Sequence, residues 1–218
     1  MSRELFGLLL LFVQASINIP IIIKLLKVKT GKGISLTGET VWIAGGIGWI
    51  IYGYMTDSVT LMISGSLAAI GCAIVSILLW KYSRPKLAMP LGLGIFTFIA
   101  IVISGIFGGV IGLSISLSIF GVLQFLPQLL LTINDIKTRA IPAGVSVTGT
   151  TFRAFYTGGW AVYAGAWILW SITVQEIDWP LLVWGLAGVV TFGTQAAYTN
   201  FAMKRLTPAT GSIPVQSL

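Results

Sequence analysis

Two tryptophans, Trp49 and Trp160, could bind a small organic molecule, because they occupy the same place in a repeated pattern. The octapeptide "GISLTGET" (33–40) recurs as "GVSVTGTT" (144–151), and each tryptophan follows the serine of its copy by fourteen residues. An indole stacks on flat apolar surfaces, and its N–H donates a hydrogen bond. Interfacial tryptophans gather at helix ends, whereas these two lie about a dozen residues into apolar helices, so we expect them to face the bundle interior. There they either line a binding site or pack as core residues.

Two tyrosines follow the tryptophans by one helical turn. Tyr52 belongs to the segment "GWIIYG" (48–53) and Tyr163 to "GWAVYA" (159–164). A phenol at this level either closes a passage as an outer gate or lies in the aromatic belt of a membrane surface. The sequence leaves both interpretations open.

Four uncharged polar residues lie inside apolar stretches. Gln14 and Asn18 are four residues apart and therefore share one helix face, and Gln124 and Gln128 repeat that spacing. Buried amides in a membrane either join helices through hydrogen bonds or bind a solute. Both roles are candidates for all four.

Apart from charges at the two ends of the first predicted helix, Glu39 and Arg153 are the charged residues that fall within predicted spans. Glu39 in the first turn of its helix complements the helix dipole, and Arg153 could extend its side chain to the nearby surface. A sharper hypothesis is an ion pair between the two copies of the repeat, acting as a cytoplasmic gate.

Each copy also contains a proline within an apolar helix, Pro20 in the first and Pro127 in the second. Proline cannot donate to the carbonyl four residues earlier, so each helix should kink there. A kink at matching places in both copies suits a hinge, and a static kink that fills space is the alternative.

The composition places all these residues in a membrane. Of 218 residues, 56% are hydrophobic and 9% are charged, and the mean hydropathy is +0.96, whereas soluble domains are about 25% charged. The sequence has no histidine and one cysteine, Cys72, so it offers no common catalytic set or metal-ligand cluster. We therefore expect no enzyme, no cofactor and no metal. The net charge of +7 is better explained by cytoplasmic loops than by a nucleic-acid partner.

An all-α integral membrane protein with seven transmembrane helices is the predicted fold, because a span needs about 20 apolar residues. The predicted helices are 4–27, 38–56, 59–80, 88–107, 110–134, 148–173 and 180–203, with a break at Gly108-Gly109. Alternate loops hold nearly all the basic residues: Lys24, Lys27, Lys29, Lys32, Lys81, Arg84, Lys86, Lys137, Arg139, Lys204 and Arg205. This asymmetry predicts an outer N-terminus and a cytoplasmic C-terminus.

The repeat divides the chain into two similar units. Residues 1–82 and 110–205 each form a predicted triple-helix bundle, residues 83–109 form an inverting linker helix, and residues 206–218 form a cytoplasmic tail. Since three spans are an odd number, the linker lets both bundles enter the membrane in the same direction. Like-oriented repeats of this kind, related by an axis along the membrane normal, occur in transporters.

The Pro127-Gln128 pair, a short basic loop, the G-x-S turn and the W-x-x-Y helix together resemble the PQ-loop superfamily, and the 3+1+3 layout resembles its SWEET branch of sugar facilitators. The resemblance covers nearly the whole chain. It implies a sugar site built from Trp49 and Trp160 with an asparagine on the third helix of each copy. Here those positions are Ser64 and Trp184, and the first copy reads Pro20-Ile21 without the glutamine.

The expected function is therefore a transporter that moves a small neutral solute, most simply a sugar, by alternating access as a uniporter. One alternative is a proton-coupled carrier of amino acids, with Glu39 or Asp135 as the titratable acid. Another is a receptor or assembly factor that transports nothing. The expected partners are a small-molecule substrate and the lipid bilayer, with homo-oligomers left open, and the expected location is the plasma membrane.

Overall fold

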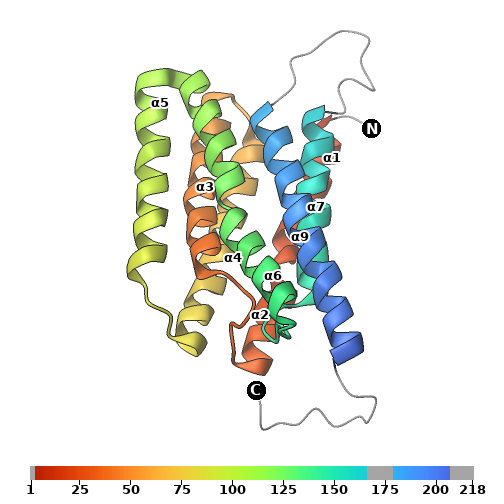
Figure 1. The fold of residues 1–218 in the computed structure, drawn as a ribbon. Coiled ribbons are helices and arrows are strands. Elements are labelled where there is room, and N and C mark those ends of the chain that lie inside the picture. Colours follow the sequence, from red (N-terminus) through yellow and green to blue (C-terminus); the bar gives the residue numbers. More distant parts are fainter. Residues whose placement is uncertain (1–2, 166–178, 207–218) are drawn as a thin grey trace.

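Helices joined by short turns and loops make up the two stretches that the computed structural model describes, residues 3–165 and 179–206. This confirms the predicted all-helical class for these stretches. The helices are α1 (Arg3–Ile17), α2 (Ile19–Val28), α3 (Leu36–Met55), α4 (Val59–Ser83), α5 (Ala88–Leu123), α6 (Leu126–Thr138), α7 (Val147–Gly165) and α9 (Trp179–Leu206). They run side by side as one bundle, with the start of α1 at the upper end and the end of α9 at the lower end (Figure 1).

Two helix boundaries coincide with the prolines that the sequence singled out. The apolar stretch predicted as one helix over 4–27 is divided at Asn18, and Pro20 is the second residue of α2. The stretch 110–134 is likewise divided near Phe125, and Pro127 is the second residue of α6. Proline is tolerated in a first helical turn, where its missing N–H would have had no partner.

The long helix α5 reverses direction at Gly109, one of the two glycines at which the sequence predicts a break. Gly109 has φ 57° and ψ −147°, a combination that residues with a side chain rarely adopt. The two legs of α5 lie side by side after this turn (Figure 1). A Cβ atom at Gly112 would clash with the carbonyl oxygen of Ser104, so the return leg depends on glycine to approach the first.

By length and composition, four helical stretches of the described residues are suited to cross a membrane: Gly7–Val28, Val59–Ser83, Ala88–Thr138 and Leu181–Arg205. The helices α3 and α7 are not among them, although the sequence predicts spans there. Both carry the repeated motif with its glycines, threonines and a charge. Other helices cover them, since α3 packs against α4 and α5, and α7 packs against α1 and α9. The polar residues Glu39 and Thr40 of α3 and Thr150, Arg153 and Thr157 of α7 are accordingly buried in the bundle interior.

The repeated motif forms the same helix start in both copies. The Ser35 hydroxyl accepts a hydrogen bond from the backbone N–H of Gly38 at 3.2 Å, and the Ser146 hydroxyl accepts one from Gly149 at 3.1 Å. Serine is a preferred residue at this position, because its side chain satisfies a backbone donor that the helix leaves free. The serine of each G-x-S turn therefore fixes where α3 and α7 begin.

Two helix pairs have the same close approach. A Cβ atom at Gly65 of α4 would lie 2.5 Å from the Gly46 carbonyl oxygen of α3, and one at Gly185 of α9 would lie 2.5 Å from the Thr157 carbonyl oxygen of α7. Gly46 and Thr157 occupy the same place relative to their motifs. Because Gly65 and Gly185 make the same contact, α4 and α9 are equivalent helices of the two copies. Ser64 and Trp184, one residue earlier in each, then occupy equivalent positions, as the comparison of the two copies predicts.

Candidate functional site

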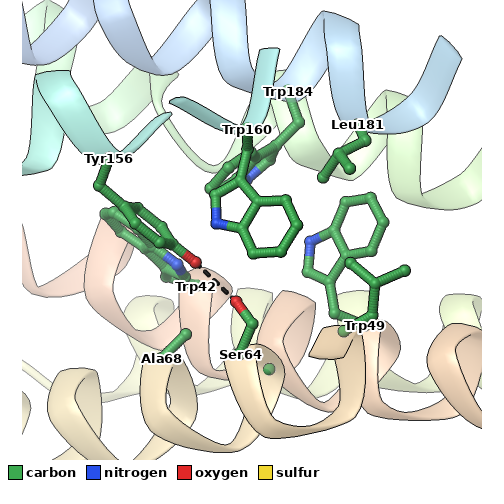
Figure 2. A pocket seen from close by; sticks show the side chains of 10 residues that line it. Trp42, Trp49, Ser64, Ala68, Tyr156, Trp160, Leu181 and Trp184 are labelled. Atoms are coloured by element: carbon green, nitrogen blue, oxygen red, sulfur yellow. Dashed lines mark hydrogen bonds between the residues drawn. The ribbon is translucent and has the colours of Figure 1, made fainter. Parts of the chain in front are cut away.

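Aromatic side chains from α3, α7 and α9 meet α4 in the upper half of the bundle and enclose a small cavity, which we call the aromatic cavity (Figure 2). Its walls are Trp42, Trp49, Leu61, Ser64, Gly65, Ala68, Tyr156, Trp160, Leu181 and Trp184. The enclosed volume is about 10 Å³, which is roughly what one water molecule requires. In this conformation the rings themselves fill most of the space.

The rings contact one another edge to face. The centres of Trp49 and Trp184 are 6.2 Å apart with planes at 71°, and those of Tyr156 and Trp160 are 6.1 Å apart at 81°. Each such pair stabilises the fold by only about 0.5–1.5 kcal/mol beyond the contribution from burying the two rings. A flat solute that separates the rings would therefore replace these contacts with similar ones.

The polar groups of the aromatic cavity are mostly donors in need of an acceptor. The Ser64 hydroxyl and the Tyr156 hydroxyl share a hydrogen bond of 2.7 Å across the cavity (Figure 2). The indole N–H groups of Trp160 and Trp184 are buried and meet no hydrogen-bond acceptor among the residues that the structure describes. A buried donor without a partner costs about 1–3 kcal/mol. The cavity is suited to a flat, partly apolar molecule that offers acceptors to these donors.

Among the wall residues that the sequence analysis did not identify, two are aromatic, Tyr156 and Trp42. When the two copies of the repeat are aligned, Tyr156 falls opposite Gly45 and Trp42 falls opposite Arg153. The alignment therefore shows no matched pair of aromatic residues at either position. A signal was present for Tyr156, which precedes Trp160 by four residues and therefore shares its helix face.

The four amides predicted as substrate contacts lie elsewhere. None of Gln14, Asn18, Gln124 and Gln128 is among the described residues that line the aromatic cavity. Gln128 joins α6 to the turn before α3 instead, because its side chain accepts from the Ser35 backbone N–H at 2.9 Å and donates to the Gly33 carbonyl at 3.0 Å. Asn18 contacts Arg153.

Gln14 and Gln124 are buried without hydrogen bonds on their side-chain nitrogens. Gln14 is 1% exposed, and neither atom of its amide has a partner in the described part of the chain. The Gln124 nitrogen also has none, while a Cβ atom at Gly45 would lie 3.0 Å from its side-chain oxygen. Both amides retain the capacity to bind a solute or water.

Glu39 and Arg153 form a buried ion pair, which the sequence analysis raised as one hypothesis beside a helix-dipole role for Glu39 and a surface-directed side chain for Arg153. The Arg153 Nη1 atom is 2.6 Å from Glu39 Oε1, and Nη2 is 3.1 Å from Glu39 Oε2. Arg153 Nη2 also donates to Asn18 Oδ1 at 2.7 Å. The two charged side chains are 4% and 3% exposed. Two parallel hydrogen bonds of this kind are the strongest arrangement for arginine and a carboxylate. Whether the pair acts as a gate stays a prediction.

The ion pair lies directly behind the wall of the aromatic cavity. The guanidinium carbon of Arg153 is 4.8 Å from the ring centre of Trp42 and 5.4 Å from that of Phe192. Trp42 therefore contacts the arginine and also lines the cavity. Because a cation is attracted to an aromatic face, Trp42 links the two features electrostatically.

Below the ion pair, the two G-x-S turns contact each other. The Gly144 backbone N–H donates to the Lys32 carbonyl at 2.9 Å. A Cβ atom at Gly33 would lie 2.5 Å from the Cβ of Pro142, and the Gly33 carbonyl accepts from both Gln128 and Gln195. The space between these turns and Arg153 is about 10 Å³. The lower end of the bundle is therefore closed in this conformation.

The two tyrosines predicted as gate or belt residues pack against the tryptophans of their own motifs. The ring centres of Trp49 and Tyr52 are 5.7 Å apart, and those of Trp160 and Tyr163 are 4.9 Å apart. Tyr163 is 6% exposed, so in this structure it is a core residue. Its role in gating stays a prediction.

No protein-family model matches this chain, and no curated protein matches it significantly. Within the described stretches, no group of three or more cysteine, aspartate and glutamate side chains is placed to hold a metal ion. The resemblance to the PQ-loop superfamily stays an expectation, and the function has to be argued from the geometry.

Proposed function

We propose that this protein is a membrane carrier that moves a small solute of no net charge by alternating access between two like-oriented three-helix bundles. The first bundle comprises α1 with α2, then α3 and α4. The first leg of α5, up to Gly109, is the inverting helix. The second leg of α5 continues into α6 and forms the second bundle with α7 and α9. This assignment gives seven spans, with the N-terminus outside and the C-terminus in the cytoplasm.

Matching contacts between helices support the two bundles. Within the units, α3 contacts α4 as α7 contacts α9, and α2 contacts α4 as α6 contacts α9. Between the units, α2 contacts α7 as α6 contacts α3. A two-fold axis along the bundle would produce this set. The equivalent serine caps and glycine contacts support the same axis.

The distribution of charge supports the proposed orientation. The helices α2, α4, α6 and α9 all end at the lower end of the bundle (Figure 1). All four have a basic residue in the last turn. Because lysine and arginine accumulate on the cytoplasmic side, this end faces the cytoplasm.

The observation that carries the proposal is that both bundles contribute equivalent residues to the aromatic cavity. Trp49 and Trp160 form one such pair, and Leu61 and Leu181 form another. Ser64 and Trp184 occupy the third matched position. A cavity on the axis between two bundles opens to either side when the bundles tilt, and this is the requirement of alternating access.

The present conformation corresponds to a carrier closed toward the cytoplasm. The two G-x-S turns and the Glu39–Arg153 pair belong to different bundles, so opening that side separates both contacts. Pro20 and Pro127 lie where α2 and α6 begin, just above these turns, and are the proposed hinges. The first turn of a helix after a proline break can tilt with little loss of backbone hydrogen bonding.

A sugar is the solute that the family resemblance suggests, and the tryptophan pair suits the apolar face of a sugar ring. The positions of the family's asparagines carry Ser64, which is bonded to Tyr156, and Trp184. Proton-coupled carriage of an amino acid is the second candidate, favoured by the buried carboxylate of Glu39. The third interpretation, a receptor without transport, predicts binding without flux.

Flux in liposomes containing the purified protein tests the proposal. We expect protein-dependent uptake of at least one radiolabelled sugar or amino acid, measured with and without a pH gradient. Trp49→Ala and Trp160→Ala should each reduce it at least tenfold, because each removes one wall of the cavity. Trp80→Ala is the matched control, since Trp80 is 43% exposed near the end of α4, and it should retain uptake.

Two results would contradict the proposal. One is uptake that is unchanged in both cavity variants, which would mean that the solute passes elsewhere. The other is the absence of flux for every solute tested in correctly inserted protein, which would favour the receptor interpretation.

A further inference from the structure

The ion pair joins the two proposed bundles and therefore has to break during each transport cycle. Glu39 lies on α3 and Asn18 between α1 and α2, both in the first bundle, whereas Arg153 lies on α7 in the second. When the bundles separate on the lower side, Arg153 loses every acceptor that the structure shows for its two Nη atoms. Glu39 loses its cation in the same step.

Two separated charges in a poorly hydrated interior are strongly unfavourable, because each loses the partner that offset its desolvation. The solute leaves through this opening, so it is available to replace the lost partners. A polyol compensates neither charge fully, an anion would leave Glu39 alone, and a cation would leave Arg153 alone. A solute with one positive and one negative group compensates both.

We propose that the transported solute is a zwitterion, whose carboxylate binds the Arg153 guanidinium and whose ammonium group binds the Glu39 carboxylate as the pair opens. This inference rests on the proposed function and specifies the solute class. A zwitterion has no net charge, as that function requires. Amino acids are the simplest small molecules with this arrangement of charges.

The position of the pair also defines where the rest of the solute lies. Trp42 contacts Arg153 on one side and lines the aromatic cavity on the other. A solute bound to both charges through its α-carbon substituents would extend its side chain past Trp42, toward Trp160 and Trp184. An apolar or aromatic side chain therefore fits better than a charged one.

Binding of matched ligands to the purified full-length protein tests the charge requirement. L-Phenylalanine, phenethylamine and 3-phenylpropionate share the benzyl group but differ in the charged groups, and L-leucine, glycine and D-glucose complete the set. We expect calorimetry at pH 7 to show that phenylalanine binds at least tenfold more tightly than the amine or the acid. If none of the three amino acids binds, or if phenylalanine, the amine and the acid bind equally, the inference is wrong.

Charge variants distinguish a direct contact from a structural role. The Glu39→Gln variant keeps the Arg153 guanidinium without its carboxylate, so its binding preference should shift toward the acid 3-phenylpropionate. The Arg153→Gln variant keeps the carboxylate alone, so its preference should shift toward the amine phenethylamine. Glu39→Gln/Arg153→Gln leaves no unpaired charge, and it should fold and lose the preference for the zwitterion. Retained preference in this double variant would overturn the inference. Asp57→Asn and Arg205→Gln alter exposed charges and serve as controls.

Flux separates failure of this inference from failure of the proposed function. If liposomes take up glucose but not the amino acids, and if Trp49→Ala reduces that uptake, the chain is a carrier and the zwitterion inference is wrong. If neither class crosses, the proposed function itself fails. Uptake of phenylalanine that Glu39→Gln and Arg153→Gln each reduce at least tenfold, while both controls retain it, supports both.

Discussion

Arg153 depends on its partners more than any surface residue would, because a buried guanidinium cannot release its proton to escape an unfavourable site. Its partners Glu39 and Asn18 come from elsewhere in the chain and are also buried. The N–H at Nε has no acceptor in the described stretches, so the hydrogen bonds of the two Nη atoms alone offset the cost of burying the charge. Much of the local stability therefore depends on the contact of Arg153 with Glu39 and Asn18.

We predict that Glu39→Gln lowers the free energy of unfolding by about 3–5 kcal/mol, because it leaves a buried charge without its counterion. Glu39→Gln/Arg153→Gln should be clearly more stable than that single variant, since it removes both charges. Denaturant titration of purified protein in detergent measures these differences. The control variant Asp57→Asn, at an exposed position, should change the free energy of unfolding by less than about 0.5 kcal/mol. A double variant whose loss equals the sum of the two single losses would show that the residues are not coupled.

The contact between α7 and α9 depends on a missing side chain. A Cβ atom at Gly185 would lie 2.5 Å from the Thr157 carbonyl oxygen and 2.7 Å from the Ala161 backbone nitrogen. Both neighbours are backbone atoms and cannot rotate away. We predict that Gly185→Ala destabilises the protein by about 1–3 kcal/mol, as overpacked core substitutions do, and lowers the melting temperature in detergent.

Gly92→Ala is the matched control, because nothing lies within 4 Å of a Cβ atom at that exposed position on α5. There alanine should be neutral or stabilising by up to about 1 kcal/mol, from helix propensity alone. Equal effects at the two positions would mean that α7 and α9 do not pack as closely as described.

At this scale the sequence predicted the local features and missed those that depend on contacts between helices. Pro20 and Pro127 restrict the backbone and Gly109 permits a positive φ, so the breaks near them could be predicted. The ion pair could be raised only as a hypothesis, because Glu39 and Arg153 are charges within apolar stretches but each also had a role that needs no partner from the other copy. The pairing of Gln128 with the Gly33 turn could not, because it depends on the rotation of each helix within the bundle.

The whole molecule combines an enclosed, aromatic upper half with a closed lower end. Contacts between the proposed bundles occur at three levels: Ser64 with Tyr156, Glu39 with Arg153, and the two G-x-S turns. All three are polar contacts and can be exchanged for contacts with water or a solute. The bundles are therefore held together by interactions that can be broken and formed again.

The orientation of the molecule can be tested with cysteines at the two ends of α4. Thr56 precedes this helix and Lys86 follows it, and both are exposed. If α4 crosses the membrane with its C-terminal end inside, Thr56→Cys should react with an impermeant maleimide added to intact cells, and Lys86→Cys should react only after the membrane is permeabilised. The unaltered chain is the control, because its cysteine, Cys72, is 1% exposed and should not react. The reverse pattern would invert the proposed direction of both bundles, and labelling of both positions from outside would mean that α4 does not cross the membrane.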